Sequence, residues 1–322
     1  MAESKKPVAL EYLDRIGVDV STQVTGLLVT HWHGDHIKGA SQLFQECAQA
    51  AIFISAALQQ EEAISLACLY QRDLARTDKG IGEFRKIVDF IYNQQNYSRI
   101  IPTTSNTYLF NVPTDNASKL VALSPSSQAT LLSSIEFQYL LPKLGTRSAR
   151  KRIFPRGPNF NAVATHFTFG SFSALLGSDL EDSGNVNTGW SAVVGSGVFK
   201  RQGLSKSNVF KVAHHGSENG HNAKVWEELL IEKPLAITTP FSSHKLPKPT
   251  DTERIAKLAG EFVVTKKSES KKKIRRDRMV EREMSSIARD RNVIDSSMGH
   301  IQIRAKLDGS YKLNTNDHCI SY

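Results

Sequence analysis

Apolar and polar positions follow two different periods along this chain of 322 residues. The apolar spacing over residues 7–16 predicts a short amphipathic helix that ends at Gly17. The uninterrupted β-branched and apolar run 24–30 predicts a strand buried on both faces of a sheet. A helix over 39–48 and a buried strand over 51–55 complete a strand-helix-strand unit of the parallel type, so the pattern predicts the α/β class.

The later pattern adds helices, hairpins and further buried strands. Helical periodicity runs from 58 to about 97 with a break at Gly80 and Gly82, and 124–140 contains another helix. Strands are predicted over 106–112, 119–123, 163–169, 172–176, 209–213 and 235–239, with a helix over 223–231. The pair 163–169 and 172–176 predicts a hairpin, and a last hairpin joins 301–307 to 311–313.

Composition narrows the class of protein and its partners. No run of about 18 apolar residues occurs, and the first residues lack the apolar core of a secretory signal, so we expect no membrane span and a cytoplasmic location. Cys47, Cys68 and Cys319 lack C-x-x-C spacing, which argues against a disulfide framework and a thiolate zinc finger. The formal net charge of +9 favours an anionic partner.

The positive charge is concentrated in two segments. Residues 143–158 are rich in arginine and contain two prolines, which predicts an exposed loop. Residues 266–291 mix many Lys and Arg with acidic residues around a thin apolar stripe, so they predict a solvated helix or an arm. Such a segment is either a solvated face or a contact for nucleic acid, and aromatic residues for base stacking are missing near it.

Four potential metal ligands lie within six residues directly after the first predicted strand: His31, His33, Asp35 and His36. Imidazole nitrogen and carboxylate oxygen suit a borderline ion such as Zn²⁺. Alternate side chains of an extended segment point the same way, so His31 and His33 can share one metal while Asp35 and His36 turn toward a second. The alternative is a histidine-rich surface loop without function.

This loop, H-W-H-G-D-H, is followed by G-S-D at 177–179 and by H-H-G-S at 214–217. In this order the three motifs resemble the metallo-β-lactamase superfamily, and the resemblance spans residues 10–265. It implies an αββα sandwich for a domain over 1–265, followed by the basic arm over 266–295 and a C-terminal hairpin over 296–322 that packs on it. The segment K-V-A-H-H-G-S at 211–217 resembles the branch that contains the soluble domain of the competence protein ComEC.

The resemblance also implies roles for residues. It makes Asp179 the carboxylate that bridges two metals, although an aspartate capping a helix or turn would look the same. At least one of His214 and His215 would face the site as a ligand or as a donor, the alternative being a structural pair. The implied metal ligands are His31, His33, Asp35, His36, Asp179, His214 and His215. The implied cofactor is Zn²⁺, in two copies, with Mn²⁺ as the alternative.

Other residues are candidates for contact with the substrate. Lys211 and Ser217 could hold an anionic group, and His244 stands where the ComEC-like branch often has a final ligand or a substrate-contacting histidine. An exposed loop histidine is the equal alternative for His244. The superfamily commonly has one more ligand histidine before the bridging aspartate, and here only His166 is available. Because His166 lies inside a predicted strand, we expect a sheet residue.

Two departures from the family follow. Without the additional histidine, one metal position is short of a ligand, so another residue or water fills it or only one metal binds tightly. The chain also starts at about the first helix of the family, without the usual paired N-terminal strands. We therefore expect an exposed sheet edge in their place.

The sequence predicts a metal-dependent hydrolase. Metal coordination lowers the pKa of bound water to about 7, which would supply hydroxide as the nucleophile. Asp35, Asp179 and His215 are the expected catalytic residues, and the ComEC-like resemblance and the basic segments favour a phosphodiester, with nucleic acid as one candidate. The alternatives are hydrolysis of a small ester, thioester or lactone, and a catalytically impaired binding or regulatory member of the fold.

Overall fold

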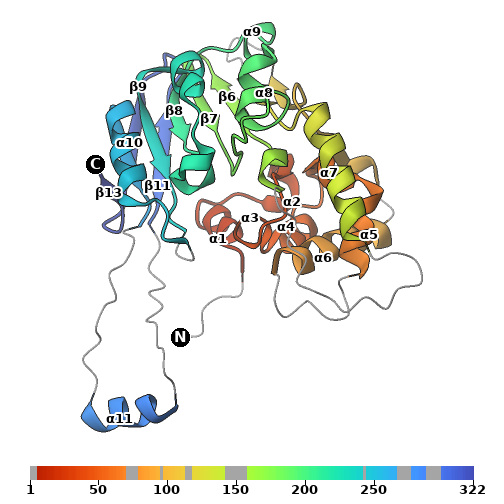
Figure 1. The fold of residues 1–322 in the computed structure, drawn as a ribbon, viewed down its shortest axis with the longest axis vertical. Coiled ribbons are helices and arrows are strands. Elements are labelled where there is room, and N and C mark those ends of the chain that lie inside the picture. Colours follow the sequence, from red (N-terminus) through yellow and green to blue (C-terminus); the bar gives the residue numbers. More distant parts are fainter. Residues whose placement is uncertain are drawn as a thin grey trace.

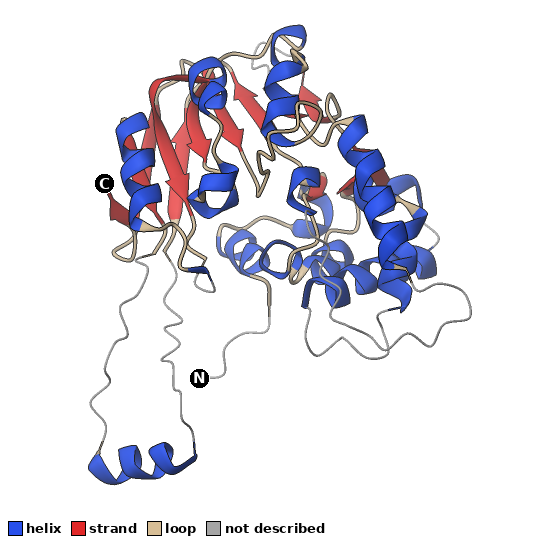
Figure 2. Cartoon of the chain, in the orientation of Figure 1, coloured by secondary structure: helices blue, strands red, loops and turns tan. Residues whose placement is uncertain are grey.

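The computed structural model describes residues 6–69, 79–94, 97–112, 118–141, 158–241, 244–266, 277–287 and 299–322. Within them the strands form a three-stranded sheet, an eight-stranded sheet and a two-stranded sheet, and helices surround the larger ones (Figures 1 and 2). The α/β class predicted from the hydrophobic pattern is confirmed. No described helix combines the length and the apolar composition that a membrane crossing requires.

The smaller sheet is parallel, in the order β1-β2-β3. Its strands are β1 (Gly26–Val29), β2 (Ala51–Ser55) and β3 (Ile100–Thr103). The helices of this half are α1 (Val8–Arg15), α2 (Val20–Gln23), α3 (Gly34–Ile37), α4 (Ala40–Glu46), α5 (Glu61–Leu69), α6 (Lys79–Gln94) and α7 (Ser127–Leu140). Trp32, Phe44 and Ile52 belong to the buried core of this half, which includes side chains from α4, α5, α6 and α7.

Two sequence predictions for this half are wrong in detail. The strand over 24–30 was expected to be buried on both faces, but in β1 Val29 is buried, Leu27 and Leu28 are half-buried and Gly26 is exposed. The strand also lies at an edge of the sheet, so the apolar run predicted the strand without its burial or its position. Gly80 and Gly82 were expected to interrupt a helix, but both lie inside α6, where packing against α3, α4 and α5 supports the helix.

The larger sheet is mixed, in the order β13-β10-β9-β8-β7-β6-β5-β4. Neighbours from β4 to β7 are antiparallel, those from β7 to β10 are parallel, and β13 is antiparallel to β10. Its strands are β4 (Tyr108–Val112), β5 (Ser118–Ala122), β6 (Thr165–Phe169), β7 (Phe172–Leu176), β8 (Ser207–Lys211), β9 (Leu230–Thr238), β10 (Glu261–Val264) and β13 (Ile320–Ser321).

Each face of this sheet is covered by different elements. α8 (Gly189–Gly195), α9 (Val198–Arg201) and α10 (Pro249–Leu258) contribute to a core around Trp190 and Phe210. The hairpin of β11 (Ile301–Ala305) and β12 (Tyr311–Thr315) packs with a second cluster around Phe172 and Val209. Both predicted hairpins, β6 with β7 and β11 with β12, are confirmed.

The remaining differences are local. The helix predicted over 223–231 is present over 223–229, where Val225–Leu229 form a π-helical turn, and β9 begins directly after it. Within the basic arm the structure describes α11 (Arg278–Ile287), on which Met279 is exposed. The predicted basic loop over 143–158 lies almost entirely outside the described residues.

The two larger sheets are joined close to the histidine loop. The carbonyl oxygen of Thr30, at the end of β1, accepts a hydrogen bond of 3.1 Å from the amide of Val163. The hydroxyl of Ser55, the last residue of β2, donates to the carbonyl of Asn161 at 2.9 Å. The carboxyl ends of β1 and β2 therefore lie against the segment that leads into β6.

Candidate metal centre

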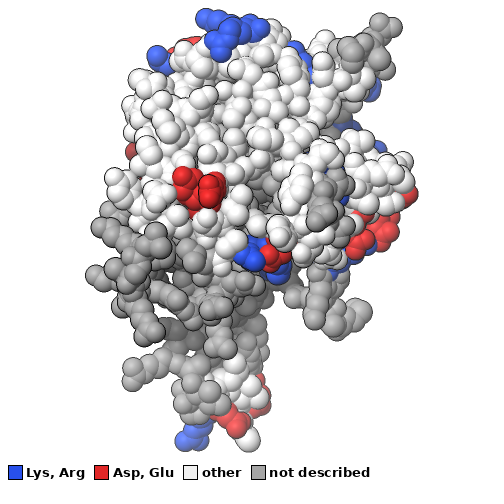
Figure 3. Space-filling model, turned by 90° about the vertical axis from the view of Figure 1, so that its right-hand side faces the viewer, with Lys and Arg blue, Asp and Glu red and all other residues white. Residues whose placement is uncertain are grey.

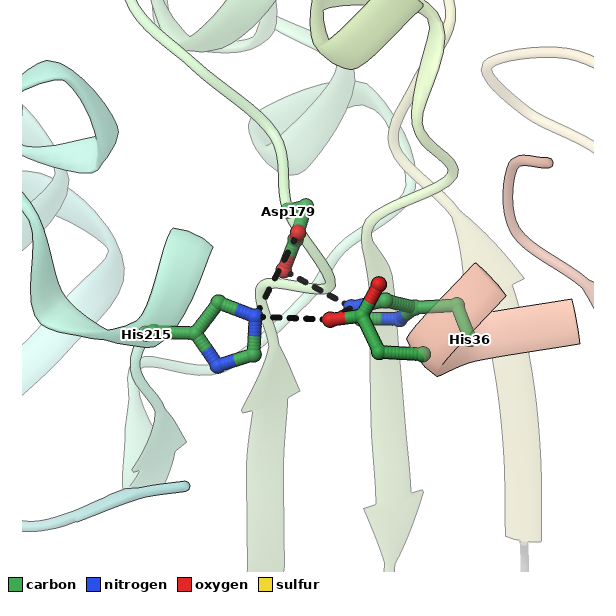
Figure 4. Close-up of side chains that lie close together, drawn as sticks. His36, Asp179 and His215 are labelled. Carbon is green, nitrogen blue, oxygen red and sulfur yellow. Dashed lines mark hydrogen bonds and ion pairs between the residues drawn. The ribbon is translucent and has the colours of Figure 1, made fainter. Parts of the chain in front are cut away.

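The candidate ligands come from three chain segments that follow strands. His31 and His33 lie directly after β1, and Asp35 and His36 form part of the short helix α3. Asp179 follows β7, and His215 follows β8. Figure 4 shows His36 and His215 approaching the carboxylate of Asp179 from opposite sides. Because β7 and β8 are parallel neighbours, the residues after their carboxyl ends are brought to the same edge of the sheet.

Four of these side chains form one group: Asp35, His36, Asp179 and His215. His36 Nε2 lies 3.1 Å from Asp179 Oδ1 and 3.5 Å from Asp35 Oδ2. His215 Nε2 lies 3.1 Å from Asp35 Oδ2 and 3.6 Å from Asp179 Oδ2. Ligands about 2.0–2.1 Å from a tetrahedral zinc ion are themselves about 3.3–3.4 Å apart. These separations therefore suit one tetrahedral ion.

A second group shares the same carboxylate: His31, His33 and Asp179. His31 Nε2 lies 3.7 Å from Asp179 Oδ2, and the rings of His31 and His33 are 4.9 Å apart between centroids. His31 Nε2 is buried and has no hydrogen-bond partner among the described residues. An unpartnered buried imidazole nitrogen is costly unless an ion binds it, so this atom fits a metal ligand.

The tautomer of His215 gives a further test of the fit. His215 Nδ1 lies 3.0 Å from the carbonyl oxygen of Thr239, which only accepts hydrogen bonds, so Nδ1 carries the proton. In the neutral ring the lone pair of Nε2 then faces the carboxylate oxygens of Asp35 and Asp179. A cation must lie between these atoms: a proton on Nε2 when the ring is charged, or a metal ion when the ring is neutral. The donor set therefore fits a divalent metal ion.

The pKa shifts favour the protonation states that bind metal. Burial acts to raise the pKa of Asp35, but the hydrogen bond with His215 and the charge of His36 outweigh it and lower the pKa to about 2. Burial opposes ionisation of Asp179 as well, and the hydrogen bond and charge of His36 lower its pKa further still. Burial lowers the pKa of His31 well below its ordinary value. Ionised carboxylates and neutral imidazoles are the forms that coordinate metals.

Neighbouring residues fix the ligands in place. The Thr30 hydroxyl lies 3.1 Å from His31 Nδ1, opposite the nitrogen that faces Asp179. The ring of Phe241 stacks on His215. Gly177 lies where β7 meets β8, and a Cβ atom there would be 2.8 Å from the carbonyl oxygen of Lys211, so a larger residue would separate the strands that carry Asp179 and His215.

Six of the seven predicted metal ligands are thus brought together, and His214 is in neither group. His214 Nδ1 lies 3.0 Å from Asn219 Oδ1 and 3.2 Å from Glu181 Oε1, and Nε2 lies 3.3 Å from Asn159 Nδ2. These partners hold His214 beside the metal ligands without pointing it at them. His166 is a buried residue of β6 whose Nε2 donates to the carbonyl of Ser205, as expected for a sheet residue.

A cavity of about 850 Å³ opens onto the candidate ligands. One part of its lining is polar, with Asn159, His214, Ser217 and Asn219, and another is apolar, with Trp32, Ile81, Phe241 and Leu246. His244 and Lys248 are exposed residues that also line it. Of the three predicted substrate-contacting residues, Ser217 and His244 therefore face this cavity.

Lys211 does not line the cavity, and its Nζ donates to the carbonyl of Val212. Burial lowers the pKa of Lys211, while Asp179 and Asp35 act in the opposite direction. No role was predicted for Lys248 or Asn219, because only the folded chain brings them to the site. The one sequence signal that could have indicated Asn219 is its position, two residues after the H-H-G-S motif.

On one face of the molecule, the charge of the described residues gives little sign of a surface that binds nucleic acid. On the face shown in Figure 3, the described Lys and Arg side chains form small separate groups with acidic side chains between them. Proteins that bind a phosphate backbone usually have a continuous basic band, and the described residues do not form one on that face.

Comparison with models of known protein families finds no match, and comparison with curated proteins finds none either. What the site can do is therefore inferred from its own residues and their geometry.

Proposed function

We propose that this chain is a metal-dependent hydrolase of the metallo-β-lactamase type, with a phosphodiester as its preferred class of substrate. The observation that carries the proposal is the meeting of His31, His33, Asp35, His36, Asp179 and His215 in two adjoining groups that share Asp179. Many sites that cleave phosphodiesters bind two metal ions a few ångströms apart. The same observation supports zinc as the cofactor, with manganese as the alternative.

The fold proposed with this function is the αββα sandwich. α8, α9 and α10 pack in the core of the larger sheet, and α4, α5, α6 and α7 pack in the core that includes β1 and β2. The ligand loops lie where these two halves meet, since β1 supplies the histidine loop and β7 and β8 supply Asp179 and His215. This placement supports the resemblance that the three sequence motifs suggested.

The chemistry divides between the metals and the side chains. Bound zinc would polarise the phosphoryl oxygens of the substrate and make water more acidic. Both carboxylates line the cavity and Asp35 is the more exposed of the two, so it is placed to orient a water molecule through a hydrogen bond. Asp179 is almost fully buried, which suits a fixed role between the two groups of ligands.

The cavity suits an ester with an anionic and an apolar part. Lys248 is the lysine among its described lining residues and can attract a phosphate at the rim. Among its lining residues, Ser217 and Asn219 offer polar atoms, while Trp32, Ile81 and Leu246 offer apolar contact. The apolar lining also favours the second candidate, hydrolysis of a small ester, thioester or lactone.

Turnover of model esters tests the proposal. Chelator-treated protein would be reloaded with zinc or manganese and assayed on bis(p-nitrophenyl) phosphate, single-stranded DNA and p-nitrophenyl acetate. We expect metal-dependent hydrolysis of the phosphodiester that Asp35→Asn abolishes and Asp317→Asn, at an exposed residue far along the chain, does not. Hydrolysis of the acetate alone would favour the second candidate. A protein that binds metal and cleaves none of these substrates would indicate a binding or regulatory member of the fold.

A further inference from the structure

The turn that follows the H-H-G-S motif carries an asparagine whose side chain lines the cavity. Asn219 lies in the short 3₁₀ turn Glu218–Gly220 and is exposed. Its main-chain carbonyl accepts a hydrogen bond of 2.7 Å from the amide of Asp182, three residues after Asp179. The backbone of Asn219 is therefore anchored to a second segment of the site.

A carboxylate fixes one proton on His214, the ring that meets the amide of Asn219. His214 Nδ1 lies 3.2 Å from Glu181 Oε1, and a carboxylate oxygen only accepts hydrogen bonds. Nδ1 therefore carries a proton whether the ring is neutral or charged. Asn159 Nδ2 donates to Glu181 as well and lies 3.3 Å from His214 Nε2, so the neutral ring accepts at Nε2.

This proton sets the orientation of the Asn219 amide. Asn219 Oδ1 lies 3.0 Å from His214 Nδ1 and 2.5 Å from the hydroxyl oxygen of Ser217, and it accepts from both. With the amide turned over, the hydrogens of Nδ2 would face the proton on His214 Nδ1. Nδ2 is therefore directed away from His214, and it has no hydrogen-bond partner among the described residues.

The same hydrogen bonds decide which residue has a hydrogen to offer an anion. Ser217 is the serine predicted from the sequence to hold an anionic group, but its hydroxyl donates to Asn219 Oδ1. An anion accepts hydrogen bonds and does not donate them, so the hydroxyl of Ser217 is not available to it. Asn219 Nδ2 has two hydrogens, and Lys248 lines the same cavity.

We propose that Asn219 Nδ2 donates a hydrogen bond to an anionic phosphoryl oxygen of the substrate. The proposal rests on the proposed function, because it places a phosphodiester in the cavity beside the candidate metal ligands. A hydrogen bond to a charged oxygen is roughly twice as strong as one to a neutral oxygen, so this contact favours an anionic ester over a neutral one. Asn219 belongs to neither group of metal ligands, so its contribution is to hold the substrate.

Two substitutions at Asn219 separate this role from a structural one. Asn219→Asp keeps an oxygen that accepts from His214 and Ser217 and replaces the free donor by a charged acceptor, whereas Asn219→Ala removes both. The measured quantity is the dissociation constant of dimethyl phosphate, obtained by isothermal titration calorimetry on the zinc-loaded chain. It should rise about threefold to tenfold in Asn219→Ala and about thirtyfold or more in Asn219→Asp. If Asn219 only supported the turn, Asn219→Ala would be the more damaging substitution.

Asn187→Asp is the control for charge alone. It adds the same charge at an exposed residue outside the cavity lining and should leave the dissociation constant within about twofold of the unmodified chain. Circular dichroism checks that each variant is folded, and native mass spectrometry checks that each binds as much zinc as the unmodified chain. A crystal structure of the unmodified chain with dimethyl phosphate needs no variant, and it should place a phosphate oxygen about 2.9 Å from Asn219 Nδ2.

Three results would overturn the inference: an unchanged dissociation constant in Asn219→Asp, a larger rise in Asn219→Ala than in Asn219→Asp, or a bound phosphate that does not contact Asn219. In each of them the unmodified chain still binds dimethyl phosphate, so the proposed function stands. A zinc-loaded chain that binds no dimethyl phosphate would contradict the phosphodiester class itself, and the inference with it. The two failures are therefore distinguishable.

Discussion

The ring of Phe241 lies nearly parallel to the ring of His215, with 5.0 Å between centroids and 18° between planes. Phe241 also stacks with His244, with 5.3 Å between ring centroids and 14° between planes. Together with the hydrogen bond between His215 Nδ1 and Thr239, this contact fixes the plane in which Nε2 faces the two carboxylates. A side chain that touches no metal thus orients one of the candidate ligands.

Phe241→Ala should therefore weaken zinc binding without removing a ligand. We expect the dissociation constant for zinc to rise about tenfold, because His215 would lose one of its two supports. His244→Ala removes the second ring that stacks with Phe241 and should change that constant little. Competition titration measures both variants, and equal effects of the two substitutions would contradict a positioning role for Phe241.

Gly177→Ala should disturb the centre through the backbone. The added Cβ would lie 2.8 Å from the carbonyl oxygen of Lys211 and 2.9 Å from the amide of Ala213. Separation of β7 from β8 should lower the free energy of unfolding by about 1–3 kcal/mol. Gly195→Ala is the control, because nothing lies within 4 Å of its added Cβ. Urea unfolding compares them, and equal stability of the two variants would show that the strands tolerate the methyl group.

Asp179→Asn should reduce the stabilisation that zinc gives to the fold. At a free zinc concentration of about 100 times the dissociation constant, binding to the folded state adds about 2.7 kcal/mol. The variant loses the one carboxylate that both groups share and keeps the remaining ligands of each, so the rise in melting temperature with zinc should shrink. Differential scanning calorimetry measures this, and Asp317→Asn should keep the full zinc-dependent rise. An undiminished rise in Asp179→Asn would contradict the shared ligand.

His166 should make the metal-free fold less stable in acid. Burial lowers the pKa of His166 to about 4, whereas an unfolded histidine titrates near 6.5. Above pH 6.5 both states are neutral, and between pH 6.5 and 4 only the unfolded chain binds the proton. The free energy of unfolding therefore falls as the pH falls through this window, by up to about 1.4 kcal/mol per pH unit.

The corresponding measurement compares urea unfolding at pH 7 and pH 5 in chelator. From pH 7 to 5 the unmodified chain should lose about 2 kcal/mol more than His166→Gln, which cannot titrate. His318→Gln should lose as much as the unmodified chain. The same loss in all three proteins would mean that His166 is not responsible.

The cavity lysine, rather than the strand lysine, should attract an anionic substrate. Lys248 lines the cavity and is exposed, whereas Lys211 donates to the carbonyl of Val212 and does not line it. Lys248→Gln should raise KM for bis(p-nitrophenyl) phosphate about threefold to tenfold, while kcat stays nearly constant. The effect should shrink in high salt. A larger change in KM for Lys211→Gln would restore the role predicted from the sequence.

Local pattern was sufficient for much of the fold. The helix at Val8–Arg15, the parallel pair β1 and β2, and the hairpins of β6 with β7 and β11 with β12 follow from periodicity and turn residues. The position of a strand within a sheet is not a local property, which is why β1 was wrongly expected to be buried. β3 was not predicted, since its four residues include a proline.

In the site, too, some residues could be predicted from the local sequence and others could not. His31 to His36 are neighbours in the chain, so their chemistry is visible in the sequence, and the family resemblance supplied Asp179 and His215. Phe241, Asn159 and Lys248 reach the cavity only through contacts between distant segments. The left-handed backbone at both His214 and His215, with φ of 46° and 54°, turns the two rings in different directions, and no spacing rule could foresee which of them meets Asp179.

The histidine loop follows β1 in one half of the chain, and Asp179 follows β7 in the other half. An ion bound by both would therefore link the two halves. The direct polar links at this junction include the bonds from Val163 to Thr30 and from Ser55 to Asn161. With the ion bound, the two halves would move as a single body. Without the ion, each half could move separately, so the metal would also determine the distance between the two halves.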